Sequence, residues 1–348
     1  MELNLIKPDD MHLHLRDGAA MRSVLPHTAA QFGRAIVMPN LKPPVTTVES
    51  ALGYRDRILA ALPEGSDFTP LMTLYLTDST QVSEIHKVAD SEHIQALKLY
   101  PAGATTNSAA GVTNIENTFA VLEAMSDAGI PLLIHGEALV DEDGHEVDVF
   151  DREKVFIDKT LIPLHRRFPD LRIVLEHITT RDAVQFVNSA TANVVATITP
   201  QHLMHDRNAI FQGGIRPHFY CLPILKRKLH QEALVEAATS DNKNFFLGTD
   251  SAPHSRSNKE NACGCAGIYS AHAALEFYAE VFEQANALDK LEAFASIHGA
   301  EFYGLEQNAE YITMRKEPWH VPESYDFGGE LIIPFHASNT LQWKVVHA

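Results

Sequence analysis

Residues 131–137 read PLLIHGE, a short apolar run that ends in a histidine, a glycine and a carboxylate. Because the run is apolar on both faces, it is typical of a parallel strand that is covered by helices. The same form recurs in seven further runs, at residues 3–15, 34–40, 70–76, 96–101, 171–177, 193–200 and 244–250. These runs predict eight strands of one parallel sheet.

Amphipathic stretches with helix start and stop signals separate the runs. Residues 46–65 open with a Thr46-x-x-Glu49 capping pattern, and residues 114–129 end at Gly129. Further helices are predicted at residues 179–190 and 224–240. Strand and helix alternate about eight times over roughly 250 residues, which predicts a (β/α)₈ TIM barrel.

An open, doubly wound sheet is the alternative architecture, but no G-x-G-x-x-G motif follows the first run. Residues 305–348 predict a short C-terminal appendage, in which residues 329–335 and 340–346 are short strands packed on the barrel. This tail is too short to fold as an independent domain. We therefore expect residues 1–348 to form a single domain.

The composition argues against several classes of protein. The chain has 348 residues, of which 45% are hydrophobic, and a formal net charge of −17. This charge argues against nucleic acid as the main partner, because phosphate binding needs a basic face. Three cysteines do not make a disulfide framework. The sequence has neither the layout of a signal peptide nor an apolar run of ~20 residues, so we expect a cytoplasmic protein without a membrane segment.

Polar side chains mark the ends of five predicted strands. In DDMHLHLRDG (residues 9–18), His12 and His14 are two residues apart, so both face the same side of a strand. The fourth, fifth, sixth and eighth strands carry, in order, Lys98, His135, His177 and Asp250. Reactive groups in a parallel barrel sit at the carboxyl ends of the strands. We therefore expect these six side chains to converge on one mouth of the barrel.

Imidazole and carboxylate ligands together suit Zn²⁺. Six candidate ligands are too many for one tetrahedral ion and predict two metals about 3.5–4 Å apart that share a bridge and hold a hydroxide. An ammonium at Lys98 has no lone pair and repels two dications, so this lysine must be neutral or modified to an anion. Taken singly, each residue also fits a structural role, such as a buried histidine with satisfied hydrogen bonds.

Ordered motifs over residues 9–267 carry a resemblance to a known family. They are DDMHLHLRDG, VMPNLKPP, ALKLYPAGATTNS, LLIHGE, LEHITT, ATITPQHL, CLPILKR, GTDSAPH and CGCAG. An H-x-H motif alone is common, but the complete ordered set is highly specific. The chain thereby resembles the amidohydrolase superfamily and, within it, the shorter, single-function dihydroorotases of bacteria.

The resemblance implies a cyclic amide hydrolase of pyrimidine biosynthesis that interconverts N-carbamoyl-L-aspartate and L-dihydroorotate. It also implies two zinc ions per subunit. Their ligands would be, for the first ion, His12, His14 and Asp250 and, for the second, His135 and His177. Lys98, carboxylated on its amine by CO₂, would bridge both ions together with hydroxide. Asp250 would also be the catalytic residue that shuttles a proton between the nucleophile and the leaving group.

The substrates carry a carboxylate that does not react. Arg16 lies two residues past His14, so it can face the same mouth, where a guanidinium suits a carboxylate. The resemblance adds Asn40 and His254 as further partners of this carboxylate.

The rest of the substrate site also follows from the resemblance. Backbone groups of Leu222 and Ala266 would meet the edge of the pyrimidine ring. The loop PAGATTNSAAG, at residues 101–111, would be a lid whose Thr105 and Thr106 reach the ligand and whose closure excludes water. A homodimer is also implied.

Two other functions stay open from the sequence. A hydantoinase would use the same metals, but such enzymes lack a fixed anchor for a substrate carboxylate. A catalytically inactive relative that serves as a scaffold would be expected to have lost ligands, and here all six positions are filled. The acidic segment 138–153 has no functional interpretation. The C-x-C of Cys263 and Cys265 is interpreted as a tight loop rather than a metal site.

Overall fold

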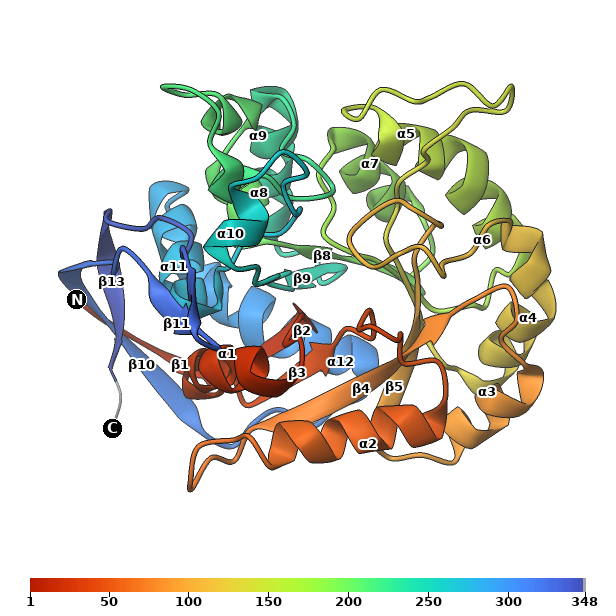
Figure 1. Cartoon of the computed structure of the whole chain (residues 1–348), viewed down its shortest axis with the longest axis horizontal. Helices are drawn as coiled ribbons and strands as arrows, with labels where there is room; N and C mark the ends of the chain where they lie inside the picture. Colours follow the sequence, from red (N-terminus) through yellow and green to blue (C-terminus); the bar gives the residue numbers. More distant parts are fainter. Residues whose placement is uncertain (347–348) are drawn as a thin grey trace.

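The computed structural model describes residues 1–346, which are built around a parallel eight-stranded barrel (Figure 1). Its strands pair in chain order and are β2 (Asp9–Leu13), β3 (Arg34–Val37), β4 (Thr69–Leu76), β5 (Ile94–Leu99), β6 (Leu132–Ile134), β7 (Ile173–Leu175), β8 (Val194–Ile198) and β9 (Phe245–Leu247). Each of the eight predicted runs overlaps one of them. Hydrogen bonds from His14 N to Ser251 O (3.1 Å) and from Asp250 N to His12 O (2.9 Å) join the first strand to the last. The predicted TIM barrel is therefore confirmed over the open sheet.

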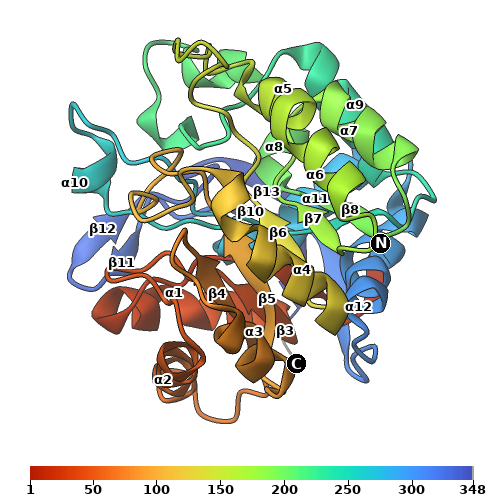
Figure 2. The same ribbon diagram turned by 90° about the vertical axis from the view of Figure 1, so that its right-hand side faces the viewer.

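Helices cover the outside of the barrel, and Figure 2 shows α3 and α4 side by side there. The α-helices of the described residues are α1 (Gly18–Gln31), α2 (Val48–Leu59), α3 (Val82–Ala89), α4 (Phe119–Ala128), α5 (Arg152–Phe156), α6 (Ile162–Arg167), α7 (Arg181–Ser189), α8 (Pro200–Met204), α9 (Lys228–Ala238), α10 (Arg256–Lys259), α11 (Ala274–Gln284) and α12 (His298–Tyr303). Shorter 3₁₀ or π-helical segments are η1 (Ile115–Thr118), η2 (Ile157–Leu161), η3 (Arg207–Ile210), η4 (Pro217–Phe219), η5 (Ala271–Ala273), η6 (Leu288–Lys290) and η7 (Ala293–Ile297). None of the helices in residues 1–346 combines the length and the apolar character that a membrane crossing needs.

The ends of two helices test the predicted start and stop signals, and one of the two predictions is confirmed. Gly129 follows α4 with a φ of 68°, the left-handed conformation that a glycine cap adopts easily, as predicted. The predicted cap of α2 was wrong by one residue. Thr47, not Thr46, has the extended backbone of an N-cap, and it forms a capping box with Ser50 instead of Glu49.

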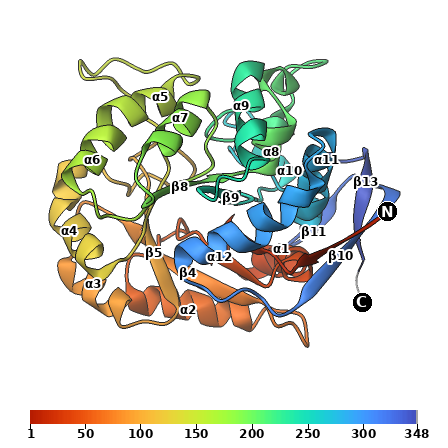
Figure 3. The ribbon, with the colours of Figure 1, turned by 180° about the vertical axis from the view of Figure 1, so that it is seen from behind.

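A three-stranded antiparallel sheet lies beside the barrel, next to α11 (Figure 3). Its order is β1 (Glu2–Ile6), β10 (Tyr311–His320) and β13 (Thr340–Val346), and a separate hairpin pairs β11 (Tyr325–Phe327) with β12 (Glu330–Ile332). The interpretation of residues 3–15 as one strand was wrong. Their first part, β1, pairs with β10 of the C-terminal appendage, because Pro8 interrupts the run and only β2 enters the barrel.

The interior of the barrel is apolar at one end, which leaves the other end for chemistry. One inward side chain from each strand forms a buried layer: Met11, Ile36, Leu71, Ala96, Leu133, Val174, Val195 and Phe246. Side chains alternate along a strand, so the residue two positions further on points inward again, one layer higher. Lys98 follows Ala96 in this way, and His135 follows Leu133. The carboxyl ends of the strands therefore carry the polar layer.

Three buried or partly buried histidines outside the metal centre predict an acid-sensitive fold. Burial lowers the pKa of His205 and His272 to about 3 and that of His336 to about 4. His205 and His336 stack at a ring distance of 5.0 Å against Phe219 and Phe335. The unfolded chain takes up these protons near pH 6.5, whereas the folded chain does not until pH 3–4. Stability is therefore lost as the pH falls below about 6.5, by up to about 1.4 kcal/mol per pH unit per histidine.

Between pH 6.5 and pH 5, we expect the free energy of unfolding to fall by up to about 2 kcal/mol less in His336→Asn than in the wild type. Urea unfolding at both pH values measures this difference. Asparagine tolerates the φ of 59° at this position. His145→Asn is the matched control, because the side chain of His145 is 78% exposed. The same pH dependence in the wild type and His336→Asn would contradict the prediction.

Candidate metal centre

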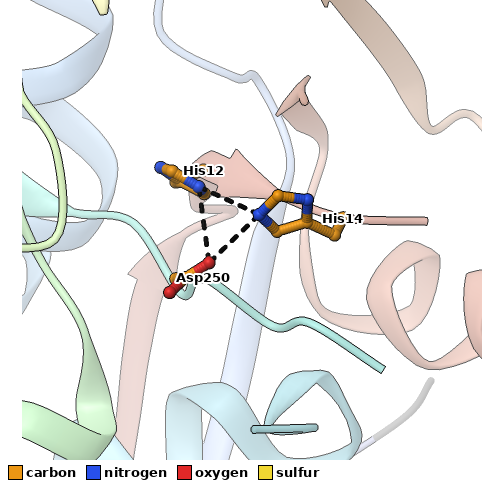
Figure 4. A group of neighbouring side chains, drawn as sticks. All are labelled: His12, His14 and Asp250. Atoms are coloured by element: carbon orange, nitrogen blue, oxygen red, sulfur yellow. Dashed lines mark hydrogen bonds and ion pairs between the residues drawn. The ribbon is translucent and has the colours of Figure 1, made fainter. Parts of the chain in front are cut away.

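His12, His14 and Asp250 form a buried cluster at the carboxyl ends of β2 and β9 (Figure 4). The Nε2 atoms of the two histidines are 3.3 Å apart. Oδ1 of Asp250 lies 3.4 Å from Nε2 of His12 and 3.2 Å from Nε2 of His14. Each residue thus directs one ligand atom to a common point, which is the arrangement that a metal ion requires.

The hydrogen bonds behind this cluster fix the two imidazoles as ligands. Nδ1 of His12 donates to Oε2 of Glu176 at 2.7 Å, and Nδ1 of His14 donates to Oδ1 of Asn40 at 2.9 Å. Burial lowers the pKa of both histidines, so they are neutral at pH 7. With the proton on Nδ1, the lone pair lies on Nε2 and faces Asp250. Partners of this kind set the tautomer and the orientation of metal-binding histidines.

His135 and His177 form a second pair beside the first. Nδ1 of His135 lies 3.2 Å from Nε2 of His177, and the rings of His12 and His177 are 5.0 Å apart. Nε2 of His135 donates to Oε2 of Glu137 at 2.7 Å. The free Nδ1 of His135 therefore faces the same space as His177.

Lys98 is fully buried, and its Nζ has no hydrogen-bond partner within residues 1–346. Burial lowers its pKa to about 8. The centroid of the Tyr100 ring lies 5.2 Å from Nζ. An unpaired buried amine is costly, and buried ionisable groups usually pair or coordinate a metal. The donor set and this unpaired nitrogen together fit a metal-binding site whose residues suit zinc.

Two buried carboxylates of the site were missed in the sequence. Glu176 orients His12 and also accepts a hydrogen bond from Oγ1 of Thr197 at 2.6 Å, while Glu137 orients His135. Burial raises the pKa of Glu176 to about 7. The usable signal is their position: Glu176 directly precedes His177, and Glu137 follows His135 by two residues. A carboxylate next to a predicted histidine ligand is a candidate for orienting such ligands.

Three residues with a strained backbone follow the strands of this site. His177, Asp250 and Arg16 adopt left-handed φ values of 42°, 45° and 64°. Such conformations cost about 1–3 kcal/mol each in non-glycine residues and persist where surrounding contacts hold them. At the ends of β7, β9 and β2, they turn the three side chains toward the mouth of the barrel.

A cavity opens directly above the histidines. It is lined by His14, Arg16, Asn40, Tyr100, Thr105, Thr106, His135, His177, Leu222, Asp250, Ala252, Ala266 and Gly267. Three of the predicted site residues, His12, Lys98 and His254, are not part of this lining. The first two lie among the metal-site residues described above, and His254 contacts Arg16. The structure therefore brings every predicted site residue into one connected region.

Arg16 provides the positive charge of this cavity. Its Nε donates to the carbonyl of Pro253 at 2.9 Å, and its Nη2 donates to Nε2 of His254 at 2.9 Å. Burial and the charge of Arg16 lower the pKa of His254 to about 2, so this imidazole is neutral and accepts the hydrogen bond. The guanidinium has no carboxylate partner among the described residues. It is therefore available to an anionic ligand.

The loop after β5 lies across the cavity. Nδ2 of Asn40 donates to the carbonyl of Thr106 at 3.2 Å, and Oγ1 of Thr106 donates to the carbonyl of Ala266 at 3.3 Å. Thr105 also lines the cavity. The loop thus rests against both sides of the site, as a closed lid would.

Comparisons with known proteins agree with this geometry. The sequence profile of the Amidohydrolase family matches residues 5–323. A dihydroorotase from Picosynechococcus is 62% identical over 99% of this chain and 98% of its own length, and one from Nitrosococcus oceani is 58% identical at the same coverage. The chain belongs to the dihydroorotases of the amidohydrolase family.

Solved structures extend this assignment. The dihydroorotase of Saccharomyces cerevisiae in complex with 5-fluoroorotic acid is 35% identical, with a TM-score of 0.91 over 99% of this chain and 98% of that one. The enzyme from Campylobacter jejuni is 37% identical, with a TM-score of 0.90 and the same coverage. An L-hydantoinase from Arthrobacter aurescens, at 16% identity and a TM-score of 0.81 over 98% of this chain and 82% of that one, shares the fold alone. Among these structures, the dihydroorotases are the nearer relatives of this chain.

Proposed function

We propose that this dihydroorotase-family chain interconverts N-carbamoyl-L-aspartate and L-dihydroorotate, a step of pyrimidine biosynthesis, with zinc. One observation carries the proposal: Arg16 lines the same cavity as His14 and Asp250 of the histidine–aspartate cluster. A metal site alone fits many cyclic amide hydrolases. A free guanidinium beside it fits a substrate whose second carboxylate does not react.

The residues present fit two metal ions. We assign His12, His14 and Asp250 to the first ion and His135 and His177 to the second, with the carboxylated Lys98 as their bridge. Bound zinc would act as a Lewis acid on the amide carbonyl and make water nucleophilic at neutral pH. The tautomers described above support this assignment, because each of His12, His14 and His135 presents a free lone pair.

The environment of Lys98 supports its carboxylation. Only the neutral amine attacks CO₂, forming an N–C bond and releasing a proton, and burial lowers the pKa of this amine to about 8. The product is an anion in a place where the unmodified side chain has no partner among residues 1–346. Modification thus removes an unpaired buried cation and supplies two oxygen ligands.

Asp250 is assigned the proton transfer. Burial opposes its ionisation, but its contacts with His14 and His12 and the charge of the unmodified Lys98 lower its pKa, so it is a carboxylate at neutral pH. In hydrolysis it accepts the proton of the attacking water and delivers it to the leaving ring nitrogen. In cyclisation the carbamoyl nitrogen attacks the carboxylate carbon, and Asp250 accepts the proton that this nitrogen loses and delivers it to the carboxylate oxygen, which leaves as hydroxide.

The substrate is held by the other residues of the cavity. Arg16, Asn40 and His254 are assigned to the carboxylate that does not react, and backbone groups of Leu222 and Ala266 to the pyrimidine edge. A polar group without a hydrogen-bond partner in such a site costs about 1–3 kcal/mol, which favours a hydrogen bond to every polar group of the substrate ring. Thr105 and Thr106 would close the lid over the ring and exclude water.

We also propose that residues 1–348 act as one domain, as a homodimer and in the cytoplasm. The pairing of β1 with β10 supports the single domain, because it ties the first residues of the chain to its C-terminal appendage. The dimer and the location are inferred from the family resemblance. Analytical ultracentrifugation of the purified chain tests the dimer.

Metal removal tests the proposed function. We expect dihydroorotate hydrolysis to fall in proportion to bound metal during chelation and to return on addition of zinc, up to two ions per chain. Metal analysis and a spectrophotometric assay of the same samples provide the measurement. Full activity in samples without metal would refute the proposed mechanism, and no dihydroorotate turnover at full zinc occupancy would refute the function.

A further inference from the structure

Lys259, the last residue of α10, is an almost completely buried lysine outside the metal centre, with 3% of its surface exposed. Its Nζ donates to three backbone carbonyls: Tyr220 O at 2.7 Å, Cys265 O at 2.9 Å and Gly267 O at 2.6 Å. An ammonium has three donors, so all of them are used. Among residues 1–346 no carboxylate pairs with it.

These three carbonyls belong to two loops, at residues 220–222 and 265–267, which form the cavity wall that we assign to the edge of the substrate ring. Tyr220 precedes Leu222 by two residues, and Cys265 and Gly267 flank Ala266. Leu222 and Ala266 both line the cavity. The loops contact each other directly, because Gly267 N donates to Tyr220 O at 3.1 Å. Lys259 therefore joins both loops from the side away from the cavity.

The backbone around Gly267 leaves little freedom for compensation. Its φ is 149°, and a Cβ at this position would lie 2.6 Å from the carbonyl oxygen of Ala252. The carbonyl of its neighbour Ala266 accepts the hydrogen bond from Thr106 of the lid. The position of this short segment therefore affects both the cavity wall at Ala266 and the contact between Ala266 and the lid.

We propose that Lys259 is a positioning residue that holds the backbone of Leu222 and Ala266 at the distance required by the edge of the substrate ring. The inference rests on the proposed function, since that function assigns these backbone groups to the ring. Burial lowers the pKa of Lys259 to about 8, so the ammonium prevails at pH 7 and can donate all three hydrogen bonds. No other cation among the described residues bridges these loops in this way.

The test is Lys259→Met, which keeps the length of the side chain and removes the three donors. We expect KM for L-dihydroorotate to rise about tenfold while kcat changes less than about threefold, because the lost contacts serve binding rather than the chemical step. Zinc content should stay at the wild-type value. Lys259→Arg, which keeps the charge and several donors, should recover part of the affinity. If Lys259→Met does not fold, Lys259→Gln carries the same test with fewer donors.

Lys226→Met is the matched control. Lys226 is also buried, at 4% exposure, but within residues 1–346 its Nζ donates only to Ile224 O, at 3.0 Å, and its charge acts on the buried Glu153. This variant should lower the melting temperature and leave KM unchanged. An equal rise in KM for both variants, or an unchanged KM in Lys259→Met, would overturn the proposal. Absence of dihydroorotate turnover in the wild type would instead overturn the proposed function.

Discussion

Lys98→Met is expected to lower kcat/KM for L-dihydroorotate by about 10⁴-fold and to reduce bound zinc below two ions per chain. The variant removes the amine that would form the proposed bridging carbamate. Lewis-acid catalysis by a metal supplies several kcal/mol of transition-state stabilisation, and each 1.36 kcal/mol corresponds to a factor of ten in rate. Loss of the proposed bridge is therefore expected to have a large effect without any change in the substrate contacts.

The fold of Lys98→Met should survive. The side chain of Lys98 is completely buried, and its Nζ has no hydrogen-bond partner within the described chain. Replacing a buried, unpaired ionisable group with an apolar one of similar length is often neutral or stabilising. We therefore expect the metal-free variant to melt at or above the temperature of the metal-free wild type. A destabilised variant would show that Lys98 has a structural partner.

Lys98→Arg separates charge from carboxylation. Arginine keeps a cation at this position, but its guanidinium stays protonated and does not form a carbamate. The loss of activity should match that of Lys98→Met, and intact-mass measurement of the wild type under native conditions should find one added CO₂. Activity within tenfold of the wild type in either variant, with two zinc ions bound, would remove Lys98 from the mechanism.

The predicted ligands come together because they depend on one topological rule. In a closed parallel barrel, all strands end at the same rim, so polar residues at successive strand ends must be neighbours. His12 and Asp250 are far apart in the chain, but the closing hydrogen bond between their backbones places them side by side. The sequence order of strands is therefore sufficient to predict which side chains meet, without any knowledge of their conformations.

The features that were missed depend on tertiary contacts. Glu137 and Glu176 were hidden because a buried carboxylate has the same appearance in a sequence as an exposed one, and only burial makes its hydrogen bond to histidine meaningful. The left-handed backbone of His177 is also unpredictable, since a histidine carries no conformational signal comparable to glycine. Likewise, β1 leaves the barrel because its partner β10 lies at the other end of the chain.

The second large effect is expected for Arg16→Met, which should lower kcat/KM for L-dihydroorotate by about 10³-fold. Truncation of one partner of a buried, hydrogen-bonded charge pair costs about 2–5 kcal/mol, and 1.4 kcal/mol corresponds to a factor of ten. The Arg16 guanidinium is fixed from two sides, by the carbonyl of Pro253 and by the neutral His254. Its position is thus fixed before a substrate binds, which suits the contact with the substrate carboxylate that we propose.

A comparison of two substrates shows whether this loss arises from the contact with the substrate carboxylate. A neutral hydantoin lacks that group, so whatever rate the wild type shows with hydantoin should change less than about tenfold in Arg16→Met. Arg34→Met is the control for the loss of a buried arginine contact. Arg34 binds Asp9 at 3.0 and 2.6 Å at the opposite end of the barrel, and its removal should lower stability without affecting kcat/KM.

Arg16 also holds the loop of His254 through Pro253, so its removal could disturb the site as a whole. Arg16→Lys resolves this point: it keeps the charge but not the planar fork, and it should retain more dihydroorotate activity than Arg16→Met. A structural role predicts parallel losses for the anionic and the neutral substrate in both variants. Selective loss of the anionic substrate alone identifies Arg16 as the residue that separates this site from that of a hydantoinase on the same fold.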